Sequence, residues 1–486
     1  MQQAAGTYEQ KQYRVMPILI SLLISGFVGM FSETALNIAI SNLMDVMNIT
    51  AATAQWLTTG FLLTLGILTP VSGLLLQWFT TRQLFVASLV CSIVGTLVAA
   101  LAPNFETLMV ARVLQAAGTG LLLPLMFNTI LIIIPAEKRG AAMGVIGLVL
   151  MFAPAIGPTI AGLLIEYLSW HWIFWISLPF LVIGLLFGLV YLDNVSQITK
   201  PKIDALSVLL STIGFGGIVF GFSKAGEGAE GWSSLPVLVS LALGLVGLLL
   251  FTLRQLYGKH PMMNLRVFTY PMFVVGLFMV LFCMMIILST MLILPLYMQN
   301  GMALTAFAAG LILLPGSILN GFMSPLMGGL FDKYGPKWLV IPGLVIVAAA
   351  LWLFSGINAG TATVLIVVLH CLLMVGIAMV WMPAQTNGLN QLPPELYPDG
   401  TAVMNTLQQV AGAIGTAIAV SILTNGIHDY MKNAEAAAAP DAAVSAMTFG
   451  SQNVFTFAMI VTLLGLVMAL FIRRVIVTHP AAKPMH

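Results

Sequence analysis

Charged side chains are scarce in this chain. They make up 7% of its 486 residues, whereas hydrophobic residues make up 60%. Ordinary soluble domains contain roughly 25% charged and 45–50% apolar residues, so this composition excludes a water-soluble fold. The net charge is only +2 and no block of basic residues occurs, which argues against a nucleic-acid partner. The lipid bilayer is therefore the expected environment of most of the chain.

Cysteine is also rare. Cys91, Cys283 and Cys371 all lie inside apolar runs, too few and too scattered for a disulfide framework or a metal site, and we interpret them as small buried hydrophobes. The chain lacks HExxH, GxSxG and P-loop signatures, and its six histidines are dispersed. Neither an enzyme activity nor a cofactor is therefore expected. If the protein moves a solute uphill, the energy must come from an ion gradient.

Long apolar runs dominate the remainder. Backbone polar groups find no water in a bilayer, so only helices or closed barrels can span it, and continuous runs of about 20 residues favour helices. The predicted fold class is an all-α polytopic membrane protein with fourteen transmembrane helices. The predicted spans are 15–41, 55–78, 84–102, 106–134, 140–165, 172–192, 204–223, 234–253, 271–296, 305–330, 338–356, 361–390, 399–425 and 453–474.

The basic residues alternate between the loops. Fifteen of the eighteen Lys and Arg fall in every second loop or at the termini, while the other loops hold only Lys224 and Lys432. By the positive-inside rule the base-rich loops and both termini face the cytoplasm. An odd number of spans would destroy this alternation, so an even number is indicated.

Two pairs of inner-loop segments repeat along the chain. GLLLQWFTTR (73–82) matches GGLFDKYGPK (328–337), and PAEKRGAAM (135–143) matches PPELYPDGTAV (393–403), with offsets of 255 and 260 residues. The repeat predicts an N-terminal six-helix half, 1–192, and a C-terminal six-helix half, 271–486. Residues 193–270 then form a two-helix insertion with its linkers. Two halves rocking around a midplane site are what an alternating-access carrier requires.

Three further segments carry a resemblance to a known family. They are LMVARVLQAAGTG (108–120), GLVLMFAPAIGPTIAG (147–162) and WHWIFWISLP (170–179). With the inner-loop repeats, they make the whole chain resemble the major facilitator superfamily, and within it the fourteen-span drug:proton antiporters of the lincomycin-efflux and quaternary-ammonium-efflux type. The resemblance implies proton-coupled multidrug efflux by alternating access, in a bacterial cytoplasmic (inner) membrane.

The resemblance also points to residues of the conformational cycle. In span five Ala153, Gly157 and Ala161 form a small-residue stripe beside prolines that favour a bend, which suits close helix packing at the seam between the halves. Packing alone is the alternative explanation. Related proteins usually carry an aspartate at position 77, so a weaker charge lock is expected in the N-terminal half. The predicted conformational residues are Gly73, Gln77, Arg82, Pro154, Gly157, Pro158, Gly162, Asp332, Gly335 and Lys337.

Two charges stand out at membrane depth, Glu33 in the first span and Arg112 in the fourth. A charge in the hydrocarbon is costly and marks a functional site by default. Both lie at similar depth, so a pair or shared hydrogen-bond network is expected. A carboxyl group whose neighbours rearrange can take up and release a proton, as coupling requires. A static ion pair is the alternative, and relatives usually have an aspartate one position earlier, where this chain has Ser32.

The cargo is predicted from the same region. The 29 methionines suit a pliable, polarizable lining. Because Glu33 is the only acid placed well inside a span, we expect neutral or monocationic amphipathic cargo. The expected partners are the bilayer, drug-like molecules and protons, and a monomer is expected. The candidate substrate-binding residues are Phe27, Met30, Asn37, Met109, Gln115, Phe152, Tyr297 and Trp381.

Other functions remain open on the sequence alone. The motifs describe mechanism more than cargo, so a dedicated exporter of a metabolite, a lipid or a monovalent cation is an alternative. An intramembrane enzyme or assembly factor is a more remote one.

Overall fold

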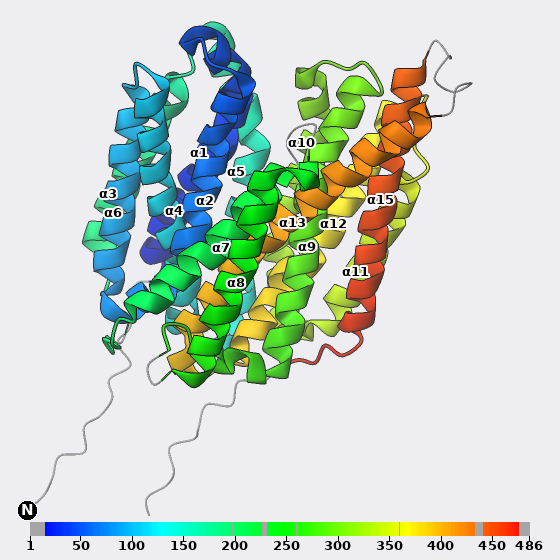
Figure 1. The fold of residues 1–486 in the computed structure, drawn as a ribbon. Coiled ribbons are helices and arrows are strands. Elements are labelled where there is room, and N and C mark those ends of the chain that lie inside the picture. Colours follow the sequence, from blue (N-terminus) through cyan, green and yellow to red (C-terminus); the bar gives the residue numbers. More distant parts are fainter. Residues whose placement is uncertain are drawn as a thin grey trace, which may run out of the picture.

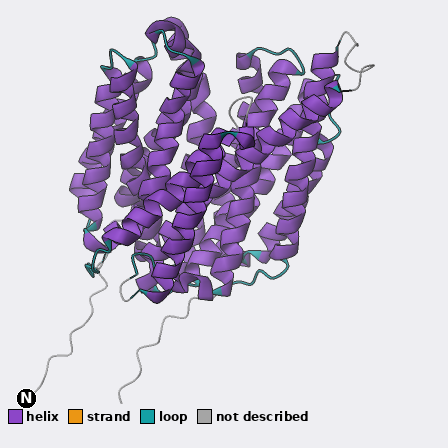
Figure 2. Cartoon of the chain, viewed as in Figure 1, coloured by secondary structure: helices purple, strands orange, loops and turns teal. Residues whose placement is uncertain are grey.

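The computed structural model describes residues 15–196, 198–225, 231–258, 261–358, 360–432 and 441–475. Fourteen helices in these ranges are long and apolar enough to cross a membrane, and the ranges contain no strand, which confirms the predicted fold class (Figure 2). The helices are α1 (Val15–Met47), α2 (Ala51–Trp78), α3 (Thr81–Ala100), α4 (Phe105–Ile133), α5 (Arg139–Tyr167), α6 (Trp172–Tyr191), α7 (Ala205–Ala225), α8 (Leu235–Tyr257), α9 (Pro271–Asn300), α10 (Ala306–Tyr334), α11 (Lys337–Phe354), α12 (Thr363–Asn390), α13 (Tyr397–Met431) and α15 (Ala442–Ala469).

Local sequence explains where several helices begin and end. Thr80 and Gln83 form a capping box at the start of α3, and Asn104 caps α4 by accepting a hydrogen bond from the Thr107 amide. These side chains satisfy amide donors that the first turn of a helix leaves without partners. At the other end of a helix, Gly335 has φ +82° and stops α10, a conformation that favours glycine.

Two predicted boundaries differ from the structure. The predicted spans 399–425 and 453–474 leave residues 426–452 between them, whereas in the structure α13 continues to Met431 and α15 already begins at Ala442. Alanine is the best helix former, so Ala442, Ala443 and Ala446 favour a helix in the first turns of α15 although this stretch is less apolar than the spans. Residues 433–440 lie outside the described part of the chain. Helix α1 likewise continues to Met47 instead of ending at 41.

The helices pack as two related groups. In the first, α1 packs on α4, α5 and α6, while α3 packs on α4 and α6; in the second, α9 packs on α12, α13 and α15, while α11 packs on α12 and α15 (Figure 1). The groups meet where α5 packs on α10 and where α2 packs on α13. In each of these two contacts the second helix of one group packs on the fifth helix of the other. The internal repeat predicts this symmetry. The division at 192 and 270 stays a prediction that this packing supports.

Helices α7 and α8 form a pair beside the α2–α13 contact. Helix α7 packs on α8, α2 and α13, and α8 turns many large apolar side chains outward, as a lipid-facing helix does. The pair is fixed at one end by Asp204, which accepts hydrogen bonds from Arg254 at 2.5 and 2.9 Å and from the Ser207 hydroxyl at 2.6 Å.

The described chain starts at Val15 and finishes at Val475 at the same end of the bundle, which we call the terminal end (Figure 1). The two halves approach each other most closely near this end. On α5, a Cβ at Gly140 would lie 2.4 Å from the Gly328 carbonyl oxygen of α10, so only glycine permits this approach. The ribbons of α1 and α5 diverge from α10 towards the opposite end. The helices are therefore arranged with their terminal ends closed against each other.

Candidate functional site

Arg112 lies at the centre of a polar network in the first half. Its side chain on α4 is 0% exposed, and its Nε donates to the Leu57 carbonyl oxygen on α2 at 3.3 Å. One Nη donates to the Ser32 carbonyl oxygen on α1 at 3.1 Å. A single guanidinium thus bridges three helices. Its planar set of donors makes such bridging possible, and a lysine could not reproduce it.

The same guanidinium is held from two further sides. It lies 4.1 Å from the centroid of the Phe61 ring, close enough for a cation–π contact. It also donates to Gln115 Oε1 at 3.1 Å, and Gln115 Nε2 donates to Thr96 Oγ1 on α3 at 3.0 Å. The second Nη of Arg112 is buried without a partner in the described structure. One donor therefore remains for a group that the present arrangement does not supply.

Glu33 follows Ser32 on α1 and is partly buried. It attracts Arg112 electrostatically, yet within the described residues the two side chains form neither an ion pair nor a hydrogen bond. The two charges therefore interact at a distance, and the role of the pair stays a prediction. The Glu33 carboxyl is near the guanidinium and is not tied to it.

The candidate substrate-binding residues do not form one group. Phe27, Met30 and Met109 pack against one apolar cluster in the first half, and the Phe27 ring stacks 6.4 Å from Phe31. Phe152 of α5 meets the Phe322 ring of α10 edge-on at 6.3 Å, at the contact between the halves. The side chain of Asn37 lies outside the described residues.

The two aromatic candidates of the second half differ in their partners. Tyr297 of α9 is fully buried, and its hydroxyl donates to the Asn358 carbonyl oxygen at 2.8 Å. Trp381 of α12 is 3% exposed and its indole N–H is buried without a partner in the described structure. Trp381 thus keeps a free donor, while the polar atom of Tyr297 is committed to the loop after α11.

Asp332 joins the halves at the terminal end. Its carboxylate, in the last turn of α10, accepts hydrogen bonds from the amides of Gly140 at 2.8 Å and Ala141 at 2.9 Å, in the first turn of α5. A carboxylate at a helix N-terminus satisfies free amides and the helix dipole. At the equivalent position of the first half, the Gln77 side chain lies 3.4 Å from Thr199 Oγ1, in the segment after α6.

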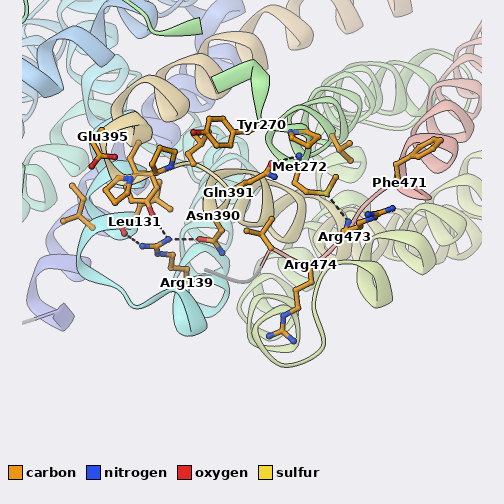
Figure 3. Close-up of a pocket in the computed structure, with 18 residues that line it drawn as sticks. Leu131, Arg139, Tyr270, Met272, Asn390, Gln391, Glu395, Phe471, Arg473 and Arg474 are labelled. Atoms are coloured by element: carbon orange, nitrogen blue, oxygen red, sulfur yellow. Dashed lines mark hydrogen bonds between the residues drawn. The ribbon is translucent and has the colours of Figure 1, made fainter. Parts of the chain in front are cut away.

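Arg139 is a second link between the halves, although in the sequence it is visible only as one of the basic residues of the inner loops. It is 6% exposed, and one Nη donates to Asn390 Oδ1 at 2.9 Å and to the Tyr397 hydroxyl at 3.0 Å. The other donors bind the carbonyl oxygens of Leu131 and Ile134. Arg139, Leu131, Asn390 and Tyr397 border a cavity of about 1220 Å³ at the terminal end (Figure 3). The repeat of the PAEKRG and PPELYP segments was the signal that could have indicated it.

The small residues predicted in span five pack within the first half. A Cβ at Gly157 would lie 2.6 Å from Thr34 Oγ1 on α1, whereas a Cβ at Gly162 would meet nothing within 4 Å. Pro154 is buried, and the side chain of Pro158 lies outside the described residues. The glycines of α5 that approach the other half closely are Gly140, Gly144 and Gly147 instead.

The remaining motif residues lie at the terminal end. A Cβ at Gly73 would meet Ala402 of α13 at 2.9 Å, so the first copy of the motif also contacts the opposite half. Arg82 donates to the Leu189 carbonyl oxygen at 2.6 Å within its own half. Lys337 begins α11 and is exposed.

Comparison with known proteins places the chain in a family. The model of the Major Facilitator Superfamily matches residues 22–416. The chain is 68% identical over 469 residues to lincomycin resistance protein LmrB of Bacillus subtilis (strain 168), covering 96% of this chain and 98% of the relative. It is 60% identical over 474 residues to the protein of the same name in Listeria monocytogenes serovar 1/2a, covering 98% and 100%.

A solved structure shows the same fold at low identity. The human organic anion transporter MFSD10 (TETRAN) aligns with a TM-score of 0.61 and 13% identity, covering 94% of this chain and 100% of that chain. The fold, the internal repeat and the near-full-length relatives agree. This chain belongs to the major facilitator superfamily of membrane transporters.

Proposed function

We propose that this protein is a multidrug exporter of a bacterial inner membrane that exchanges protons for amphipathic drugs, lincomycin-like compounds among them. The near-full-length relatives named for lincomycin resistance support the class of cargo. The observation that carries the mechanism is the Glu33 carboxyl, which lies at membrane depth beside a fully buried guanidinium and forms no hydrogen bond in the described structure. A charge in this position is costly unless it has a task.

Glu33 is the proposed proton carrier, and Arg112 is its sensor. When Glu33 is ionised it attracts Arg112, and that attraction is strong in a medium of low dielectric constant. Protonation removes the attraction and leaves Arg112 held by its neutral partners, which include the Ser32 and Leu57 carbonyl oxygens. Because these bonds join α1, α2 and α4, a change of charge at Glu33 alters how three helices of one half pack.

The structure supports a cycle in which the terminal end opens and closes. Asp332 caps α5 from the opposite half, and Arg139 reaches Asn390 and Tyr397 across the same end. These bonds hold one side of the carrier closed and must break before the halves can separate there. A set of polar contacts at an interface between two rigid halves is suited to such a two-state motion.

The base-rich loops lie at the terminal end, so we assign this end and both termini to the cytoplasm. The described arrangement is then the one closed towards the cytoplasm. Helices α7 and α8 stand beside the core of twelve helices, in accordance with a monomer whose lipid contacts include the outer face of α8.

Transport in proteoliposomes tests the proposal. Purified protein with an imposed pH gradient should move labelled lincomycin uphill, and dissipation of the gradient should stop it. Glu33→Gln should bind drug and lose uphill transport. Gradient-independent movement would reject proton coupling, and failure of every drug in a panel while a metabolite moves would favour a dedicated exporter.

A further inference from the structure

The segment after the sixth helix of the first half crosses the end of α2. The amides of Thr199 and Lys200 donate to the Gln77 carbonyl oxygen at 3.1 and 3.2 Å, and Trp78 Nε1 donates to the Pro201 carbonyl oxygen at 2.7 Å. The chain that leaves α6 is thereby fastened to the last turn of the second helix of the same half.

The second half repeats this arrangement with different chemistry. After α15, Arg474 donates through Nη2 to the Asp332 carbonyl oxygen at 2.5 Å and through Nη1 to the Lys333 carbonyl oxygen at 3.2 Å. Asp332 is the repeat equivalent of Gln77, at an offset of 255 residues. The same turn is therefore fastened in both halves, by backbone amides in the first and by one arginine side chain in the second.

The path of the C-terminal segment 470–475, which we call the strap, is fixed by α12 and α9. Asn387 Nδ2 donates to the Arg473 carbonyl oxygen at 2.9 Å, and Asn387 Oδ1 accepts from the Val475 amide at 3.1 Å. The Arg473 amide donates to the Met272 sulfur at 3.1 Å. Figure 3 shows the side chains of Arg473 and Arg474 leaving the strap in different directions. The backbone of the strap is thus placed independently of either arginine side chain.

Arg474 fastens the residue that closes the carrier. The Asp332 carboxylate caps α5 of the other half, while the Asp332 carbonyl oxygen accepts from Arg474. The guanidinium also attracts that carboxylate electrostatically. Next to it, a Cβ at Gly335 would lie 2.9 Å from Arg474 Cδ, so the arginine stem packs closely on the glycine that ends α10. Both the backbone and the charge of Asp332 are positioned by the strap.

We propose that the strap is part of the closing mechanism, with Arg474 as the positioning residue that holds Asp332 against the start of α5. This inference rests on the proposed alternating-access cycle. Opening of the terminal end then requires α10 to move relative to α5, and the strap sets how firmly the last turn of α10 resists that movement. The second half uses a side chain, which can release its two carbonyl partners without unfolding the backbone.

Hydrogen exchange of the full-length protein in nanodiscs tests the proposal directly. The peptide that contains the amides of Gly140 and Ala141 reports whether Asp332 caps α5. Arg474→Ala should raise exchange of these amides by roughly threefold to tenfold, because the cap loses a positioned acceptor. Arg473→Ala is the matched control, since its side chain makes no hydrogen bond in the described structure, and it should leave exchange unchanged.

Two further variants separate positioning from general damage. Arg474→Lys keeps the charge but cannot bridge two carbonyl oxygens equally well, so its exchange should lie between wild type and Arg474→Ala. In an Asp332→Ala background, Arg474→Ala should add nothing. Equal exchange in wild type and Arg474→Ala, or an equal increase in Arg473→Ala, would overturn the proposal. Absence of proton-driven transport by the wild type would instead reject the proposed function. The hydrogen-exchange comparison would still test the role of Arg474 in the strap.

Discussion

The Arg112 guanidinium donates to the Ser32 carbonyl oxygen at 3.1 Å, one residue before Glu33. The basic side chain of α4 is thus hydrogen-bonded to the backbone of α1, next to Glu33, which attracts it. In the proposed mechanism, a change in the charge of Glu33 alters the packing of α1 against α4 through this bond. The arrangement differs from a direct salt bridge, in which each charged group would be the main partner of the other.

Glu33→Gln should preserve the fold and abolish proton-driven transport, because glutamine keeps the shape and hydrogen-bonding capacity but cannot titrate. We expect uphill transport in the pH-gradient assay to fall at least about tenfold, as for loss of a group that acts in every cycle. Downhill exchange of drug across the same vesicles serves as the control and should persist. Wild-type uphill transport by this variant would remove Glu33 from the mechanism.

Arg112→Ala should be more harmful than Arg112→Lys. Alanine leaves the Ser32 and Leu57 carbonyl oxygens without their donor, and charge-assisted bonds of this kind each contribute about 1.5–3 kcal/mol. Lysine restores one donor and the charge. Thermal unfolding in detergent and transport in proteoliposomes should both rank wild type above Arg112→Lys and Arg112→Ala last. Equal behaviour of the two variants would contradict the bridging role.

Gly140→Ala should disturb the closed terminal end. The new Cβ would lie 2.4 Å from the Gly328 carbonyl oxygen and 2.5 Å from Asp332 Oδ1, and overpacking of this kind costs roughly 1–3 kcal/mol. Gly162→Ala, on the same helix, meets nothing within 4 Å and is the control. Proteolysis or alkylation from the terminal side should increase in Gly140→Ala only. Equal increases in both variants would indicate a general effect of α5.

The Asp204–Arg254 pair should make stability depend on acid pH. Hydrogen bonds from Arg254 hold the pKa of the Asp204 carboxyl below its ordinary value of 3.8. A lowered pKa in the folded state means that the pair stabilises the fold above the ordinary pKa and that this contribution is lost as pH falls through the folded value. The unfolding temperature of wild type should exceed that of Asp204→Asn at pH 7, and the difference should shrink below about pH 4. A difference independent of pH would show that titration is not involved.

Dicationic drugs should be exported poorly compared with matched monocations. Two other acids lie near helix ends: Asp399 accepts a hydrogen bond from the Asn264 amide at 3.0 Å, and Glu166 is exposed near the end of α5. Glu33 alone gives little electrostatic compensation for two positive charges in a medium of low dielectric constant. Export of matched compounds from the same cells measures this. Equal export of dications would mean that Asp399 or Glu166 reaches the cargo.

The sequence by itself determined the membrane environment, the fourteen helices and the family, because each depends on local composition, on the alternation of basic loops or on contiguous motifs. It also indicated Glu33 and Arg112, since a charge inside an apolar run is visible without any knowledge of packing. The start of α15 at Ala442 was less predictable, because helix propensity and hydropathy give different boundaries there.

Only the tertiary structure decided which long-range contacts form at the terminal end. Arg139 meets Asn390 and Tyr397, and Arg474 meets Asp332, across 251, 258 and 142 positions of the chain. No periodicity connects such residues, because their contacts arise from the crossing of helices that are distant in sequence. The same holds for Glu33 and Arg112: the sequence gives their depth, but the rotation of α1 and α4 about their axes decides that the guanidinium bonds the Ser32 carbonyl oxygen and leaves the carboxyl untied.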